Sequence, residues 1–315
     1  MRRIFIALLL AGIGGTSLDA QAPGTSAPAA SSQETPDTTR IKVRVDLVNV
    51  LFTVTDKKSR RILDLKRDDV QVLEDNKAQT VRYFSRETDL PLRIGLVLDT
   101  SNSVRDRLRF EQEAAIDFLS AALHPKRDLA FLVSFDTTTQ MVQDYTDDTE
   151  KLSDAIRELR AGGSTALYDT IYFACKEKML FFPPPEPYLR RVLVVISDGK
   201  DNQSEHTRDE ALAMAQHGEV IMFTISTNRT GVEGPGDKVL KYLARETGGR
   251  VFFPFAATDL AANFEEIARE LRSQYSLAYV STNSARDGTF RNISIRTREK
   301  DLNVRAKSGY FAPSK

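Results

Sequence analysis

The chain has 315 residues, of which 41% are hydrophobic and 28% charged, values that are ordinary for a globular protein of one large domain or two modest ones. Its 44 lysines and arginines balance its 44 aspartates and glutamates, so no net field attracts nucleic acid or an anionic membrane, and we expect no nucleic-acid binding. A single cysteine, Cys175, excludes a disulfide within the chain and a zinc site built from several thiolates.

Residues 1–22 have the pattern of a secretory signal peptide. Arg2 and Arg3 precede an apolar stretch from Ile4 to Ile13, and a small-x-small cleavage site follows at Ala20-Gln21-Ala22. The apolar stretch is shorter than the roughly 20 residues that span a bilayer, so we expect cleavage and no membrane span in the mature protein. An uncleaved N-terminal anchor is the alternative. The sequence thus predicts export, with the periplasm, the cell surface or the medium as destination.

The next two segments differ in pattern. Residues 23–40 are small, polar and proline-containing, which predicts a disordered linker. From 41 to 90, apolar and polar residues alternate, and turn chemistry at Asp75-Asn76 separates two short runs. We expect a β-rich segment over 41–90.

Residues 91–272 alternate between strand and helix patterns. Stripes at helical spacing, such as Leu260, Phe264, Ile267 and Leu271, lie between continuous apolar runs. Such runs are typical of strands covered on both faces, so we predict an α/β fold with a doubly wound, mainly parallel sheet and helices on both faces. The strand candidates are "IGLVLD", "LAFLVSF", "VLVVIS", "VIMFTI" and "VFFPF". Before the third of them, "FFPPPEPY" at 181–188 predicts a proline-stiffened connector.

Alternation returns over 273–315, in "QYSLAYV", "FRNISIRT" and "NVRAKSGYFAP". Asp287-Gly288, within "ARDGTF", predicts the turn of a hairpin. Each β-rich flank is too small to form a core alone. We therefore expect the two flanks to pair into a small accessory β domain or to dock on the α/β sheet.

Oxygen-bearing side chains gather where the first buried strand ends. Asp99 closes the run "IGLVLD", and Ser101 and Ser103 follow in the loop before a helix near Arg105. Ser103 alone fits the N-cap of that helix, but this interpretation leaves Asp99 and Ser101 unexplained. In an open α/β sheet, ligands bind beyond the carboxyl ends of the strands. The stretch "VLDTSNSV" therefore predicts a binding site.

Two further loops supply similar groups. "RAGGSTALYD" places Thr165 ahead of a helix, and "VLVVISDG" ends another buried strand at Asp198. Carboxylate and hydroxyl oxygens suit Mg²⁺, Mn²⁺ or Ca²⁺ rather than Zn²⁺. We predict a metal site with the ligands Asp99, Ser101, Ser103, Thr165 and Asp198, and Mg²⁺ as its first candidate.

These residues resemble a known family. "DTSNS" fits the Asp-x-Ser-x-Ser motif of the metal-ion-dependent adhesion site in the von Willebrand factor type A domain, and Thr165 and Asp198 fill its later positions. The resemblance covers roughly 92–272 and implies a Rossmann-like fold. The signal peptide, the β flank and "GYFAP" are also similar to a family of secreted proteins, related to this domain, that is abundant in acidobacteria. The resemblance implies an exported adhesion or scaffold module whose metal bridges to an Asp or Glu carboxylate of a partner protein or peptide.

Two other function classes stay open. A metal-dependent hydrolase or phosphatase of haloacid-dehalogenase type needs a second aspartate where the chain has Ser101, and no Gly-x-Ser-x-Gly elbow or phosphate-binding Gly-rich loop is present. The three histidines, His124, His206 and His217, are scattered, so we expect no enzyme. A purely structural envelope protein is the other alternative. Near the site, we expect Asp169 to hold its loop by capping bonds, Asp201 to be a solvated loop carboxylate, and Asp136 to lie at a strand end without lining the site. We expect Cys175 to be buried.

Overall fold

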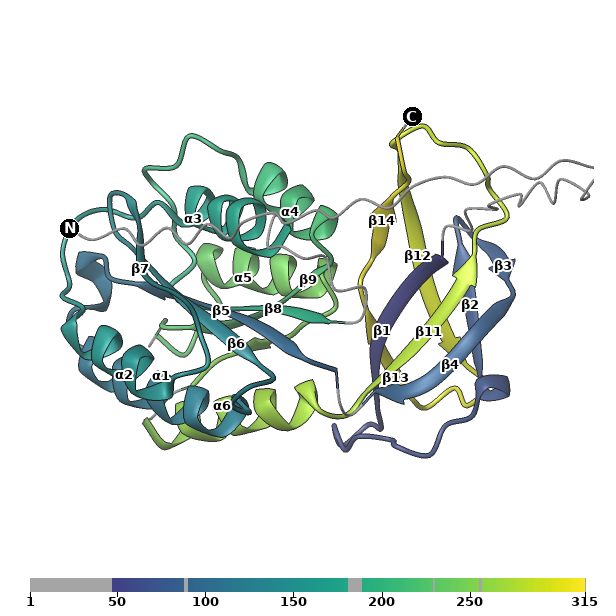
Figure 1. Ribbon diagram of the computed structural model, residues 1–315, viewed down its shortest axis with the longest axis horizontal. Coiled ribbons are helices and arrows are strands. Elements are labelled where there is room, and N and C mark those ends of the chain that lie inside the picture. Colours follow the sequence, from purple (N-terminus) through teal and green to yellow (C-terminus); the bar gives the residue numbers. More distant parts are fainter. Residues whose placement is uncertain (1–46, 88–89, 181–188, 229, 255–256, 315) are drawn as a thin grey trace, which may run out of the picture. The chain divides into compact units, whose positions relative to one another are not determined.

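The computed structural model describes residues 47–87, 90–180, 189–228, 230–254 and 257–314 (Figure 1). The predicted signal peptide, the predicted linker and the proline-rich connector at 181–188 lie outside the described residues.

A six-stranded sheet forms the centre of the α/β region (Figure 1). Five of its strands are parallel, and β7 runs antiparallel to β6 at one edge. Together with the helices on its faces, this sheet confirms the predicted doubly wound α/β fold. In the described part of the run "VFFPF", residues 251–254, only Val251–Phe252 form a strand, since Pro254 has no N–H to donate to a neighbouring strand. In sheet order, the strands are β10 (Val251–Phe252), β9 (Val220–Ser226), β8 (Arg190–Ser197), β5 (Leu92–Asp99), β6 (Leu129–Phe135) and β7 (Thr139–Thr146).

Among the described residues, helices cover both faces of this sheet. Alternate residues of β5 point into opposite cores, with Leu96 and Leu98 in one and Val97 in the other. Helices α1 (Leu108–Ala122), α2 (Thr149–Glu158) and α6 (Ala257–Leu271) line the first core, while α3 (Leu167–Phe173), α4 (Arg208–His217) and α5 (Pro235–Glu246) line the second. A π-helical segment, Ala174–Leu180, continues α3 and buries Cys175, and this burial raises the pKa of the Cys175 thiol. In the described ranges, no helix has both the length and the apolar character needed to cross a membrane.

The two β-rich flanks pair with one another in two antiparallel four-stranded sheets (Figure 1). β1 lies between β11 and β13, and β2 pairs with β12, so strands from both ends of the chain share each sheet. Their apolar residues form one core around Phe52, Val72 and Leu277. The sheets contain β13 (Asn303–Ala306), β1 (Leu47–Thr55), β11 (Gln274–Val280) and β4 (Val81–Glu87), and β14 (Gly309–Phe311), β12 (Phe290–Thr297), β2 (Val70–Glu74) and β3 (Lys77–Gln79).

The two turn predictions in these flanks have different outcomes. Asp75 and Asn76 both have positive φ, 46° and 66°, as a two-residue type I′ hairpin requires, and they join β2 to β3. The hairpin predicted at Asp287-Gly288 is wrong, because β11 and β12 lie in different sheets. Residues 281–289 cross from one sheet to the other.

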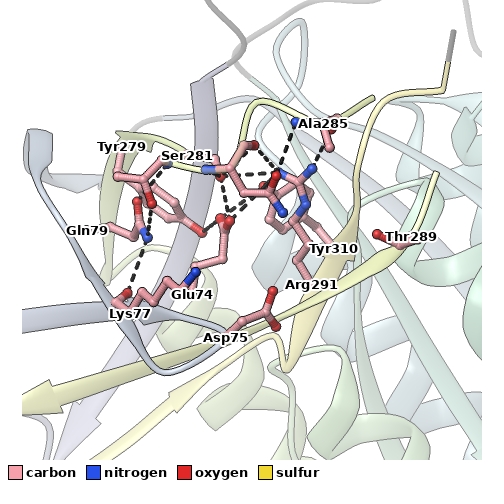
Figure 2. A network of polar contacts seen from close by, with 12 residues as sticks. Glu74, Asp75, Lys77, Gln79, Tyr279, Ser281, Ala285, Thr289, Arg291 and Tyr310 are labelled. Carbon is pink, nitrogen blue, oxygen red and sulfur yellow. Dashed lines mark hydrogen bonds and ion pairs between the residues drawn. The ribbon is translucent and has the colours of Figure 1, made fainter. Parts of the chain in front are cut away.

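A buried ion pair holds this crossing connection (Figure 2). The guanidinium of Arg291 on β12 lies 3.7 Å from Glu74 on β2, and it also donates to backbone carbonyls in 283–285. The carboxylate of Glu74 accepts hydrogen bonds from the hydroxyls of Tyr279 at 2.9 Å, Tyr310 at 3.0 Å and Ser281. Because the two charges are almost fully buried and well bonded, they fix the crossing segment to both sheets.

Candidate metal centre

Asp99 lies at the carboxyl end of β5, between β8 and β6, where the sheet has its topological switch point. Its side chain is fully buried. Oδ1 accepts the N–H of Ser101 at 2.9 Å, and Oδ2 accepts the hydroxyl of Ser197 at 2.6 Å. Burial raises the pKa of Asp99 above its usual value, and the nearby charge of Asp198 adds to this rise, while the hydrogen bonds oppose it. A cation beside Asp99 would therefore relieve an unfavourable buried negative charge.

Ser101 and Ser103 present their hydroxyls together. A 3₁₀ turn over Asn102–Val104 brings the two Oγ atoms to 2.9 Å, with Ser101 buried and Ser103 exposed. Helix α1 begins only at Leu108, and its N-cap, Arg107, makes no side-chain capping bond. The N-cap alternative for Ser103 is thus wrong, because the 3₁₀ turn separates the serine from the helix.

Backbone hydrogen bonds fasten the loop that carries Thr165 to the loop that follows Asp99. The N–H of Gly162 donates to the carbonyl of Thr100 at 2.7 Å, and the N–H of Asn102 donates to the carbonyl of Gly163 at 3.3 Å. The two loops, which are about sixty residues apart in the chain, therefore run side by side.

The same loop is fastened to the one that follows β8. The N–H of Thr165 donates to Oδ1 of Asn202 at 3.0 Å, and the N–H of Asn202 donates back to the carbonyl of Thr165 at 3.1 Å. Asp201 accepts the N–H of Tyr168 at 3.0 Å. Thr165 is nearly buried, and its hydroxyl forms no hydrogen bond within the described part of the chain, so this oxygen is available to an ion.

Asp198 is held by its own turn and by α5. Gly199 has a φ of +73°, and a Cβ at this position would lie 2.2 Å from the carbonyl oxygen of Gly236. A Cβ on Gly236 would in turn lie 2.1 Å from the carbonyl oxygen of Asp198. The N-terminus of α5 therefore packs directly on the Asp198–Gly199 backbone, which only glycine permits at both positions. Both carboxylate oxygens of Asp198 accept hydrogen bonds from Lys200.

Asp237 and Glu111 are acidic residues near the site that were not among the predicted ligands. Asp237, in the first turn of α5, accepts hydrogen bonds from Ser226, Asn228 and the N–H of Gly234. Glu111, on the buried face of α1, forms no hydrogen bond through its carboxylate in the described chain and lies 3.9 Å from the side chain of Arg107. Burial raises the pKa of Glu111 to about 8 against the opposing charge of Arg107, and the charges of Asp99 and Asp198 add to this rise. In the sequence, Glu111 shares a helical stripe with the apolar residues Leu108 and Ala115. An acidic residue in such a stripe is the signal that could have identified Glu111.

Two of the predicted ligands, Ser103 and Asp198, line an open cleft. In the described residues, no group of three or more His, Cys, Asp or Glu side chains is arranged to hold a metal ion. The predicted set differs in kind, because it combines two carboxylates with three neutral hydroxyls, a donor set that fits a hard divalent cation. The residues lining the cleft include Ser103, Asp106, Arg107, Asp198, Lys200, Thr227, Asn228, Thr230, Gly234 and Asp237.

Of the neighbouring acids, Asp169 has the expected structural role, whereas Asp201 is not the solvated carboxylate that the sequence suggested, because it is half-buried and hydrogen-bonded. Asp136 accepts the N–H of Thr138 within its own turn at 3.1 Å. Asp169 accepts the N–H groups of Glu205 and His206 at 3.0 and 2.8 Å, and so holds the loop that follows Asp198. Asp201 fastens the same loop to α3, because it accepts the N–H of Tyr168.

Comparison with known proteins agrees with the family resemblance. Residues 94–200 match the model of the von Willebrand factor type A domain, which confirms the resemblance over that range. No curated protein matches the chain in sequence. A solved structure, "von Willebrand factor type A from Catenulispora acidiphila", is similar with a TM-score of 0.50 and 11% identity, over 86% of this chain and 75% of that chain. At this identity the likeness concerns the fold alone.

Two other solved structures are similar with TM-scores below 0.5. Proximal thread matrix protein 1 from the mussel byssus, with a zinc-occupied motif of the metal-ion-dependent adhesion site (MIDAS), has a TM-score of 0.49 and 17% identity, over 63% of this chain and 49% of that chain. A D319A mutant of the PilB minor pilin from Streptococcus sanguinis has a TM-score of 0.47 and 14% identity, over 58% of this chain and 62% of that chain. This chain thus spans about half of the mussel protein and 62% of the pilin. The narrower resemblance to the acidobacterial family stays a prediction.

Proposed function

We propose that the protein is an exported, divalent-metal-dependent binding module, an adhesion or scaffold protein rather than an enzyme. The cation would be Mg²⁺, with Mn²⁺ or Ca²⁺ as alternatives. Its ligands would be Asp99, Ser101, Ser103, Thr165 and Asp198.

The observation that carries this proposal is the fastening of three loops to one another at the carboxyl end of the sheet. Hydrogen bonds between backbones link the loop after Asp99 to the loop of Thr165, and the latter to the loop after Asp198. The buried Asp99, whose pKa is raised, the exposed hydroxyl of Ser103 and the buried hydroxyl of Thr165 are suited to a cation. The match of residues 94–200 to the von Willebrand factor type A domain supports the same conclusion.

The donor set supports binding through a partner's carboxylate. Two carboxylates only balance the charge of a divalent ion, and the three hydroxyls add no charge. The ligands therefore carry no excess negative charge that would repel an outside anion, and the ion can still attract one. The cleft beside Ser103 and Asp198 gives an incoming side chain a path to the ion. An Asp or Glu of a protein or peptide would supply that anion.

Calorimetric titration tests the metal site. Titrating Mg²⁺ or Mn²⁺ into the purified protein should give binding that Asp99→Ala weakens at least about tenfold, because removing even a supporting group near a metal costs that much. Asp154→Ala is the matched control, since Asp154 is an exposed acid on α2 with a partner of its own, Arg157. Equal metal binding by the wild type and Asp99→Ala would refute the proposed site.

A pull-down from exported proteins, with and without a chelator, tests the binding function. We expect a partner that is retained only with the metal and is lost with Asp99→Ala. Metal binding without any metal-dependent partner would favour the structural alternative. Turnover of a phosphate ester that depends on Asp99 would favour the hydrolase.

A further inference from the structure

Lys200 contacts both oxygens of Asp198. Its N–H donates to Oδ1 at 3.1 Å, and its ammonium Nζ donates to Oδ2 at 2.8 Å. The side chain of Asp198 is only 11% exposed, whereas that of Lys200 is 71% exposed. An exposed, flexible cation thus holds a nearly buried carboxylate from the solvent side.

The position of Lys200 also places it in the field of neighbouring acids. The negative charges of Asp198, Asp99 and Asp237 all act on its ammonium group. The other basic side chain lining the cleft, Arg107, donates to the carbonyl of Thr227 and lies beside Glu111. Of these two basic side chains, Lys200 is the one that is bonded directly to a predicted metal ligand.

We propose that Lys200 is a built-in competitor of the divalent cation: its ammonium group must leave Asp198 before the metal can use that carboxylate. This inference rests on the proposed function. A doubly charged ion beside Asp198 would repel the ammonium, and the four-carbon side chain of Lys200 is free to move into solvent. Lys200 thereby lowers the affinity of the site for metal.

The expected effect is modest, because exposed ion pairs are weak. A pair of this kind contributes about 0.2–1 kcal/mol, so its removal should tighten metal binding by up to about fivefold. Salt screens the interaction, so the difference should shrink as the ionic strength rises.

Calorimetric titration of Mg²⁺ or Mn²⁺ into the full chain tests the inference. We expect Lys200→Gln to bind about 1.4- to fivefold more tightly than the wild type, as a pair of this strength implies. Lys200→Arg, which keeps the charge, should bind like the wild type. Lys151→Gln is the matched control, since Lys151 is 66% exposed and pairs with Asp148 at 3.6 Å on α2. This control should leave metal affinity unchanged.

Amine labelling followed by mass spectrometry gives a second readout. Adding Mg²⁺ should increase the labelling of Lys200 relative to Lys151, because the metal releases the ammonium from Asp198. Unchanged or weaker metal binding by Lys200→Gln, or labelling of Lys200 that does not rise, would overturn the inference. Failure of the wild type to bind metal would instead overturn the proposed function, so the two failures can be told apart.

Discussion

The clearest quantitative prediction concerns the buried Glu111. Its pKa is about 8 in the folded chain and 4.5 for an ordinary glutamate, with burial as the largest cause. Below pH 4.5 the carboxyl group is neutral in both folded and unfolded chains. Above that pH the unfolded chain loses the proton, while the folded chain keeps it up to about pH 8, so the protein loses stability as the pH rises between these values.

The size of this loss follows from the pKa difference. Since one pKa unit corresponds to about 1.4 kcal/mol, ionisation of Glu111 should lower the free energy of unfolding by about 5 kcal/mol at most. Glu111→Gln keeps the shape of the side chain and cannot ionise. We therefore expect this variant to be more stable than the wild type above neutral pH, with a difference that grows up to about pH 8 and then stays constant.

Urea denaturation followed by circular dichroism, at a series of pH values from 5 to 9, measures this difference. Subtracting the two free energies of unfolding removes the contributions of groups that titrate alike in both proteins. Glu113→Gln is the matched control for the chemical change, because Glu113 lies on the same helix but is exposed. A flat difference curve for Glu111→Gln, or a Glu111→Gln variant that is less stable than the wild type at pH 8, would refute the reasoning.

Two further substitutions test the packing around the site and between the two four-stranded sheets of the β-rich flanks. Gly199→Ala should lower the free energy of unfolding by about 2 kcal/mol or more and weaken metal binding, because its Cβ would lie 2.2 Å from the carbonyl oxygen of Gly236. Gly162→Ala is the control: its Cβ would have no neighbouring atom within 4 Å, so both stability and metal binding should stay unchanged. Arg291→Met should cost about 3–5 kcal/mol in urea denaturation, because it leaves the buried charge of Glu74 without its partner, and a loss below 1 kcal/mol would contradict this account.

The sequence was most informative where burial is uniform. The runs predicted for β6 and β9 match those strands to within one residue, because strands covered on both faces are apolar throughout. The edge strand β7 has no such run, since its residues are mostly half-buried, and it was not predicted. Edge strands face both helices and solvent, and their residues need not follow either pattern.

Local sequence patterns did not predict which strands pair when they lie far apart in the chain. Asp287-Gly288 does form a turn, with a φ of +68° at Gly288 and a bond of 3.0 Å from the N–H of Thr289 to Asp287. A local turn signal does not determine which sheet the following strand joins. Here β12 pairs with β2, about two hundred residues earlier, and the buried pair of Glu74 and Arg291 stabilises that choice.

The same distinction applies to the site. The approach of the loops carrying Asp99 and Asp198 follows from a general rule, because parallel strands bring their carboxyl ends to one edge. Thr165 lies in a loop between α2 and α3, so this rule does not cover it. The positions of Glu111 and Asp237 do not follow from any such rule. The stripe of Leu108 and Ala115 indicates that Glu111 faces the core, but how near it lies to Asp99 depends on how the helix packs against the sheet.

The contacts around the candidate site indicate that its geometry is set by the fold itself. Gly162, Asn102 and Asn202 hold the loop backbones, Ser197 orients Asp99, and α5 packs on the turn after Asp198. A site preorganised in this way spends little free energy on ordering loops when an ion binds. Its affinity must then depend mainly on the balance of charge among Asp99, Asp198 and Lys200. Substituting Lys200 should therefore change metal affinity without changing the fold, whereas substituting Gly199 should change both.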